Sequence, residues 1–224
     1  PMGGGAIVVG RDINTFYLRK WAGVDTTTGK PLWERVDPTT GAVTVIDDYN
    51  KATLQHVGRS TPDYSGGFST SLSYKGFVLA TDFVYSKGGV AYNTGREFFD
   101  SDGAYPYYNQ MVLQDGWSRW TPTNTNATHP KLVYGGNSNS NKASSRYLED
   151  ASFLRMRNVR LAYNFEQKNI ESLGLKGLTI YVSGDNLWTS TKYTGADVEA
   201  VISGDTTSNY PNPKRYTFGV NLNF

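Results

Sequence analysis

"RYTFGVNLNF" (residues 215–224) is a stretch in which apolar residues alternate with polar, charged or small ones. The apolar positions are Tyr216, Phe218, Val220, Leu222 and Phe224. Successive side chains of a β-strand point to opposite faces, so this pattern gives the strand one apolar face and one small or polar face. We therefore predict a strand that has an apolar environment on one side and water on the other.

The same period of two occurs in other parts of the chain. The segments that show it are residues 68–74, 77–85, 158–165 and 178–183. Only Lys75 and Gly76 separate the first two, and a two-residue connection between alternating segments predicts a tight β-hairpin. A further strand is predicted within residues 12–20, although its two faces are less distinct. Residues 166–173 predict a turn or two of helix at most.

The charge composition excludes nucleic acid as an expected partner. The 224 residues include 22 Lys and Arg against 20 Asp and Glu, and the basic residues are scattered. Cysteine is absent, and His56 and His129 stand far apart without a second ligand at metal-binding spacing. We therefore predict no disulfide framework, no metal site and no cofactor, and we expect both histidines in loops.

The aromatic content favours a chain that meets a membrane interface or a carbohydrate. Aromatic residues make up 14% of the chain, and the 16 tyrosines suit surfaces that are apolar and wet at once. The sequence contains no apolar run of about 18 or more residues, so it predicts no membrane-spanning helix. A barrel strand, in contrast, needs only about 9–11 residues of alternating pattern. The opening "PMGGGAIVVG" does not match a signal peptide, so we expect a chain that is not exported or one whose beginning is missing.

The predicted strands are joined by connections of very unequal length. Short links at residues 75–76 and 166–176 alternate with long ones at residues 88–149 and 187–213. Outer-membrane barrels combine short periplasmic turns with long extracellular loops, whereas a compact sandwich rarely contains such long irregular loops. Closed barrels have about eight strands or more. We therefore predict an all-β chain that supplies the C-terminal strands of a large antiparallel transmembrane β-barrel with long extracellular loops.

A repeated turn motif lies inside the first long segment. "DTTTG" at residues 25–29 and "DPTTG" at residues 37–41 each offer an Asp at the first turn position and a Gly that accepts positive φ. We predict a local hairpin here, flanked by short strands. Asp47 and Asp48 follow it and keep a calcium site open as an alternative, although a calcium loop should offer more closely spaced carboxylates.

The sequence contains no residue set that predicts catalysis. No G-x-S-x-G elbow occurs between a strand and a helix. The adjacent carboxylates Glu149 and Asp150 would point to opposite faces of an extended segment. We interpret them as ion-pair partners beside Arg146 and Arg155, and we predict that the protein is not an enzyme.

Several blocks of the sequence resemble one family of outer-membrane proteins. The blocks span residues 9–33, 60–88, 144–165, 178–199 and 210–224. The most specific are "EDASFLRMRNV" and "SGDNLWT", with the terminal phenylalanine as a third feature. Together these blocks are similar to the closing third of SusC/RagA-type TonB-dependent transporters of Bacteroidetes.

The resemblance implies a larger protein around this chain. Residues 1–224 would be the C-terminal segment of a barrel of about 22 strands, with the plug domain and N-terminal strands outside this sequence. The complete protein would import glycan or peptide oligomers across the outer membrane of a Gram-negative bacterium. Its implied partners are TonB, a SusD-like surface lipoprotein, membrane lipid or lipopolysaccharide and the barrel-assembly machinery. A dimer of transporter–lipoprotein pairs remains open.

The loop at residues 88–149 is rich in aromatic residues for a solvated segment. The candidates for contact with substrate or with the lipoprotein lid are Tyr107, Tyr108, Trp117, Arg119, Trp120 and Tyr134. Flat rings with a polar edge stack on sugars and peptide side chains and are frequent in interface hot spots. Packing of the loop upon itself is an equally good interpretation of the same residues.

The terminal strand suggests a second role. In the resembling family a terminal aromatic residue is read by the barrel-assembly machinery, which makes Phe224, with Leu222 and Phe218, the expected assembly signal. Anchoring of Phe224 at the membrane interface is the alternative. For the whole protein the alternatives are a non-transporting outer-membrane barrel or adhesin, and a soluble all-β carbohydrate-binding module.

Overall fold

The computed structural model describes residues 7–202 and 210–224, with side chains through residue 200 and again from residue 210. The chain divides into two compact units. We call the first, described at residues 7–61, 89–150 and 201–202, the loop unit, and the second, Pro62–Gly88, Ala151–Ala200 and Tyr210–Phe224, the sheet unit. Each unit is considered by itself.

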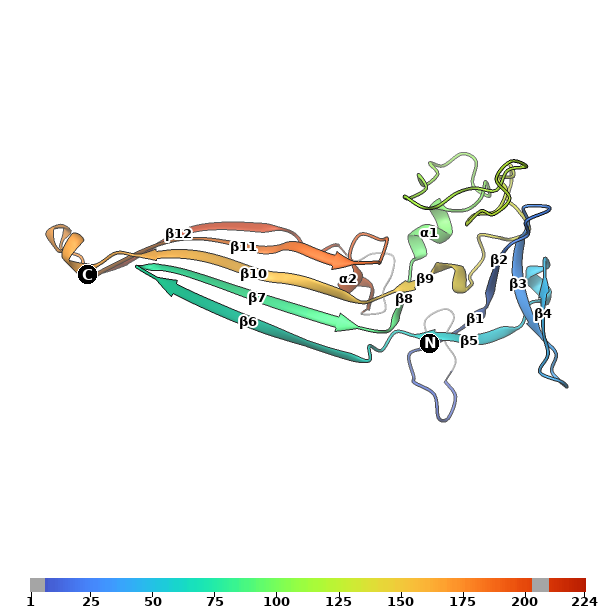
Figure 1. Cartoon of the computed structure of the whole chain (residues 1–224), viewed down its shortest axis with the longest axis horizontal. Coiled ribbons are helices and arrows are strands. Elements are labelled where there is room, and N and C mark those ends of the chain that lie inside the picture. Colours follow the sequence, from blue (N-terminus) through green and yellow to red (C-terminus); the bar gives the residue numbers. More distant parts are fainter. Residues whose placement is uncertain (1–6, 203–209) are drawn as a thin grey trace. The chain divides into compact units, whose positions relative to one another are not determined.

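The sheet unit is built on five antiparallel strands in the order β12-β11-β10-β7-β6 (Figure 1). The strands are β6 (Tyr64–Tyr74), β7 (Phe77–Lys87), β10 (Phe153–Asn164), β11 (Gly177–Thr191) and β12 (Arg215–Asn223). Every strand predicted from the period of two, apart from residues 12–20, is therefore confirmed in this sheet. The antiparallel all-β class is confirmed as well.

The register of the sheet gathers the apolar residues on one face. Pairing across all five strands forms the row Leu72, Leu79, Leu161, Val182 and Phe218. These side chains stay between 36% and 82% exposed, although each is a large apolar group. The neighbouring row on the opposite face reads Ser71, Ala80, Arg160, Ser183 and Thr217. The sheet thus has an apolar face and a polar face, and the apolar face is uncovered within the unit.

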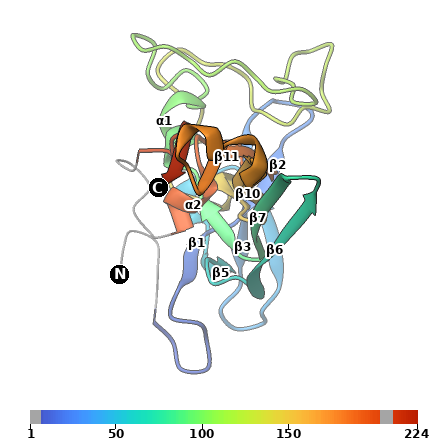
Figure 2. The ribbon, with the colours of Figure 1, turned by 90° about the vertical axis from the view of Figure 1, so that its left-hand side faces the viewer.

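Short connections and long connections lie at opposite ends of these strands. Lys75 and Gly76 make the β6–β7 turn with φ of 46° and 85°, a two-residue hairpin with positive φ at both positions. The β10–β11 link contains two 3-10 turns, η3 (Gln167–Asn169) and η4 (Glu171–Leu173), as predicted. Figure 2 looks along the strands with this coiled link in front. The predicted alternation of short and long connections is present in the sheet unit.

Gly219 of β12 is required by a neighbouring ring on the polar face. Its strand partner is Tyr181, and a Cβ at Gly219 would overlap the Tyr181 ring. The same ring receives the Arg160 guanidinium at 4.3 Å from its centroid, a cation–π geometry. The small residue in the alternating terminal strand therefore makes room for a cross-strand aromatic side chain.

The loop unit contains three small sheets. β1 (Thr15–Arg19) pairs with β5 (Leu54–Arg59), and β2 (Trp21–Val24), β3 (Pro31–Val36) and β4 (Val43–Ile46) form a meander. β8 (Val90–Tyr92) pairs with β9 (Leu148–Asp150). The strand predicted at residues 12–20 is therefore not a member of the five-stranded sheet, because its partner is β5, a strand that the sequence prediction missed.

Short helical segments and two buried aromatic residues complete the loop unit. The helices of the loop unit are η1 (Tyr49–Lys51), α1 (Thr94–Phe99) and η2 (Ser145–Tyr147). A further short helix, α2 (Val198–Ile202), begins at the end of the second segment of the sheet unit. Trp33 and Tyr147 are fully buried, and the Trp21 ring packs edge-on against Trp33 at 5.8 Å. Among the residues the structure describes, no helix is long and apolar enough to cross a membrane.

The repeated turn motif folds as predicted, twice. Asp25 Oδ1 accepts the backbone N–H of Thr27 and of Thr28, and Asp37 Oδ1 accepts the equivalent groups two and three residues on. The flanking strands β3 and β4 are present, so the local hairpin is confirmed. Asp47 pairs with Lys30 at 2.7 Å, and Asp48 caps η1 through the N–H of Asn50.

The prediction that both histidines are loop residues is wrong for His56. His56 belongs to β5 and packs against the Tyr17 ring of β1 at 4.9 Å. It lies in the segment whose strand pattern was not recognised, which explains the error. His129 is in a loop but is only 2% exposed.

Candidate functional site

The long loop of the loop unit is organised by buried charges. We call seven residues the loop charge cluster: Arg96, Asp100, Asp102, Arg119, His129, Arg146 and Glu149. Asp102 is fully buried, and Asp100 and His129 are each 2% exposed. Charged groups are rarely buried to this extent unless they are paired. The loop therefore has an ionic interior.

Asp102 is the centre of the cluster. Its Oδ1 accepts Arg119 Nη1 at 2.6 Å, and its Oδ2 accepts Arg146 Nη1 at 2.5 Å. Asp100 lies next to it, with Oδ2 at 3.0 Å from Arg96 Nη2 and at 2.9 Å from His129 Nε2. Arg96 and Glu149 complete a balanced set of three guanidinium and three carboxylate groups. Removing one member leaves a buried charge without its partner.

The electrostatics favour the ionised forms of Asp100 and Arg146. Burial raises the pKa of Asp100, but the hydrogen bond to His129 and the charge of Arg146 outweigh burial and hold that pKa below its ordinary value of 3.8. Burial lowers the pKa of Arg146, yet the charge of Asp102 more than compensates and raises it. Because the folded pKa of Asp100 lies below its unfolded value, its stabilising effect is complete above about pH 4 and is lost as the pH falls through the folded pKa.

Three of the predicted contact residues belong to this interior. Arg119 pairs with Asp102, and Trp117 packs on the guanidinium of Arg96 at 4.4 Å and on the His129 ring at 4.9 Å. Trp120 is 8% exposed and donates its Nε1–H to the carbonyl of Thr26 at 3.0 Å. Trp117 and Arg119 thus pack within the long loop, whereas Trp120 packs against the turn at residues 25–29.

The other three predicted contact residues form an exposed group, which we call the tyrosine surface: Tyr107, Tyr108 and Tyr134. Their exposed fractions are 88%, 62% and 76%. The hydroxyls of Tyr107 and Tyr134 lie 3.0 Å apart, and the Tyr108 ring packs edge-on against Phe98 at 5.2 Å. These rings are accessible, oriented by neighbours and able to stack on a ligand or on a protein partner.

The sequence analysis missed Asp100, Asp102 and His129 as parts of one network. They lie in a polar segment without periodicity, and Asp102 reaches Arg146 across 44 positions of the chain. Glu149 was correctly interpreted as an ion-pair partner, but its partner is Arg96 at 3.0 Å. The arginines of this segment could have indicated the network, because a buried guanidinium group requires a carboxylate nearby.

The sheet unit holds a second ionic network, which we call the loop clamp: Arg155, Arg157, Asp197, Glu199 and Asn212. Arg155 Nη2 donates to Asp197 Oδ1 at 2.5 Å, and Arg155 Nη1 also pairs with Glu199. Arg157 Nη2 donates to Glu199 Oε1 at 2.6 Å, and Asn212 donates to Asp197 through backbone and side chain. Burial raises the pKa of Asp197, but the hydrogen bonds from Arg155 and from the backbone of Asn212, together with the charge of Arg155, outweigh burial, and the net shift of that pKa is downward. The clamp fastens the loop after β11 to strand β10.

The loop clamp connects two of the sequence blocks that carry the family resemblance. Arg155 and Arg157 belong to "EDASFLRMRNV", and the carboxylates lie a few residues after "SGDNLWT". The β10–β11 pairing brings the two blocks side by side, with Arg155 opposite Thr189. The motif residues thus hold one another in place.

The terminal strand exposes the residues expected to signal assembly. Phe218 is 82%, Leu222 48% and Phe224 78% exposed, and the first two project from the apolar face. The structure places them at accessible positions. Their role in assembly stays a prediction.

Comparison with known proteins gives consistent matches. The chain is 34% identical over 179 residues to TonB-dependent receptor P3 of Formosa agariphila, covering 75% of this chain and 17% of that receptor. It is 28% identical over 218 residues to TonB-dependent receptor SusC of Bacteroides thetaiotaomicron, covering 96% of this chain and 20% of SusC. The structure of the RagAB peptide importer in its open-open state matches with a TM-score of 0.80 and 31% identity, over 100% of this chain and 24% of the importer chain. No protein-family model matches.

An antiparallel sheet with an uncovered apolar face and a polar face has the pattern of an outer-membrane β-barrel wall. In agreement with its relatives, the chain belongs to the SusC/RagA-type family of TonB-dependent receptors. It spans about a fifth of the length of the curated relatives it matches.

The loop charge cluster yields a stability prediction. In Asp102→Asn the guanidinium groups of Arg119 and Arg146 lose a buried counter-ion, which should destabilise the loop locally by about 3–5 kcal/mol. Limited proteolysis of the full-length receptor should then cleave within residues 100–144 much faster than in the parent protein. Asp115→Asn, the same change at an exposed position of the loop, is the control and should not accelerate cleavage. Equal cleavage of both variants would contradict the structural role of Asp102.

Proposed function

We propose that the full-length protein imports nutrient oligomers, glycans or peptides, across the outer membrane. The observation that carries this proposal is the two-faced sheet, in which exposed apolar rows lie opposite polar rows across five strands. Family membership supports the same conclusion, since the solved neighbours are named as a peptide importer. The work proposed is selective passage, with no chemical conversion.

In this proposal the apolar face contacts membrane lipid or lipopolysaccharide, and the polar face lines the lumen. Lipid offers no hydrogen-bond partners, so a sheet persists in it only when its edges are paired. Within the described strands, β6 and β12 each have one neighbour. Further strands of the full-length protein would therefore pair with both edges and close the barrel.

We propose two partners for the transport cycle. TonB would act on a part of the protein outside this chain, and a SusD-like lipoprotein would contact the loop unit from the cell exterior. The tyrosine surface is the best candidate for contact with the lipoprotein or with substrate, because its rings are exposed and oriented. Trp117, Arg119 and Trp120 would act indirectly, by shaping the loop that carries these rings. Pairing of two transporter–lipoprotein units remains an open alternative.

Uptake of labelled oligomers by cells tests the function. Cells that carry the receptor should accumulate labelled oligopeptide or oligosaccharide, and deletion of the receptor or loss of TonB should abolish this accumulation. The double variant Tyr107→Ala, Tyr134→Ala should lower uptake about tenfold, because aromatic anchors contribute a large share of binding energy at interfaces. Tyr210→Ala, at a tyrosine that is 94% exposed in the sheet unit, is the matched control.

Several results of the uptake experiment would contradict the proposal. Accumulation that survives loss of TonB would favour a passive barrel, and no accumulation of any oligomer would favour an adhesin. Recovery of a soluble, folded protein without detergent would favour a carbohydrate-binding module. Equal uptake by the double variant and the Tyr210→Ala control would remove the tyrosine surface from the proposed contact site.

We further propose that Phe224 is the assembly signal of the barrel, supported by Leu222 and Phe218. Phe224→Ala should reduce the amount of heat-modifiable barrel in the outer membrane several-fold, because the assembly machinery would no longer recognise the strand. Val220→Ala also trims the apolar face of β12 and serves as the control. Normal assembly of Phe224→Ala would leave this residue only an interfacial anchor.

A further inference from the structure

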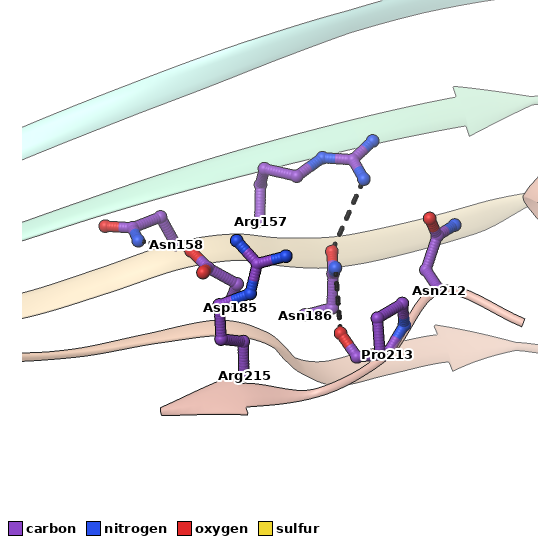
Figure 3. Close-up of a pocket in the computed structure, with 7 residues that line it drawn as sticks. All are labelled: Arg157, Asn158, Asp185, Asn186, Asn212, Pro213 and Arg215. Atoms are coloured by element: carbon purple, nitrogen blue, oxygen red, sulfur yellow. Dashed lines mark hydrogen bonds between the residues drawn. The ribbon is translucent and has the colours of Figure 1, made fainter. Parts of the chain in front are cut away.

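A polar cavity lies in the sheet unit beside strands β10 and β11 (Figure 3). Its volume is about 390 Å³, and it is lined by Arg157, Asn158, Asp185, Asn186, Asn212 and Arg215, with Pro213 as the one apolar neighbour. Asn158, Asp185 and Arg215 are strand partners in one row of the polar face. The cavity therefore opens on the side of the sheet that faces away from the apolar rows.

A break in the sheet ladder creates the cavity. The register of β10 shifts between Met156 and Asn158 against both of its neighbours: Arg157 is the extra residue of a bulge against β7, and on the other side it faces two unpaired residues of β11, Asn186 and Leu187. Asn186, opposite the bulge, takes a φ of 53° in the left-handed region. Bulges redirect side chains and are frequent beside functional sites. Here the bulge lets Arg157 reach Asn186 at 3.3 Å and Glu199 at 2.6 Å.

The polar groups of the cavity are unequally engaged. Asp185 accepts the side-chain amide of Asn158 at 2.6 Å, and Arg157 is held by Asn186 and Glu199. Arg215 differs from them, since no carboxylate of residues 7–200 and 210–224 forms an ion pair with its guanidinium. Its strand partner Asp185 is the only carboxylate among the lining residues. The lining thus carries two guanidinium groups against one carboxylate, with one guanidinium unpaired within the described residues.

We propose that this cavity binds a carboxylate of the imported oligomer, with Arg215 as the anchoring residue. This inference rests on the proposed function and specifies its substrate as an oligomer that carries a free carboxylate. A free guanidinium presents a planar fork that matches both oxygens of a carboxylate, and such bidentate pairs are strong and directional. The Asn212 amide nitrogen is engaged by Asp197 and Glu199, but within the described part of the chain its Oδ1 is left as an acceptor, and Asn186 keeps one amide hydrogen beyond its bond to Pro213 for neighbouring polar groups of the ligand.

Two substrate sources offer this chemistry. A peptide presents its C-terminal carboxylate, and an acidic glycan presents the carboxylate of a uronic acid. Both would place a planar carboxylate against Arg215, so the cavity identifies this shared group and does not distinguish its two sources. The source is distinguished by probes that differ only in whether the carboxylate is free.

Calorimetric titration of the detergent-purified full-length receptor tests the proposal. The probes are penta-alanine with a free or an amidated C-terminus, and trigalacturonate or its methyl ester. One free-acid probe should bind about tenfold more tightly than its neutral form, and Arg215→Gln should abolish that preference. Arg215→Lys keeps the charge without the fork and should retain part of the preference. Lys214→Gln removes an adjacent positive charge that does not line the cavity, and it should behave like the parent protein.

The outcomes separate this inference from the proposed function. Equal affinity for the acid and neutral forms of both probe pairs overturns the carboxylate site, as does an equal effect of Arg215→Gln and Lys214→Gln. Heat-modifiable mobility of each variant confirms that it is folded. TonB-dependent uptake of neutral oligomers does not depend on the carboxylate site. If this uptake persists while the preference for free acids is absent, the protein is an importer that lacks a carboxylate site.

Discussion

The alternation of side chains along antiparallel strands is the constraint on which the structure of the sheet unit depends. Because the side-chain period is two, a slip of one residue in any strand pair would move a whole apolar row to the polar face. Leu161, for example, would then take the place of Arg160. The register places Leu161 between Leu79 and Val182 instead. The uncovered apolar face and the proposed transport path both follow from that register.

In the loops, networks of paired charges hold segments of the chain together, as apolar packing does in most protein interiors. Several large apolar side chains of the long loop stay exposed, and arginine–carboxylate pairs around Asp102 form much of its buried interior. The loop clamp uses the same chemistry, with Arg155 against Asp197. Paired arginines position loops through directional forks, which gives these segments defined geometry without a conventional hydrophobic core.

The sequence predicted the parts of the fold that depend on the alternation of neighbouring residues. It did not predict the parts that depend on contacts between residues far apart in the chain. The alternating segments, the Lys75–Gly76 turn and the repeated Asp turns could be predicted, because each depends on neighbouring residues. Strand β5 lacks a clear alternation, so it was missed, and the partner of the strand at residues 12–20 could not be predicted. The arrangement around Asp102 could not be predicted, since its partners are distant in the chain. For the same reason the sequence did not reveal that Arg157 occupies a bulge beside an open cavity.

The most direct test is site-directed spin labelling along residues 158–164 of β10 in the full-length receptor reconstituted in bilayers. This chain contains no cysteine, so its labelling positions are introduced one at a time. Collision with oxygen, which concentrates in lipid, should peak at 159, 161 and 163, and collision with a water-soluble nickel complex should peak at 158, 160 and 164. An absence of this two-residue period, or its inversion, would contradict a sheet whose apolar face meets the membrane.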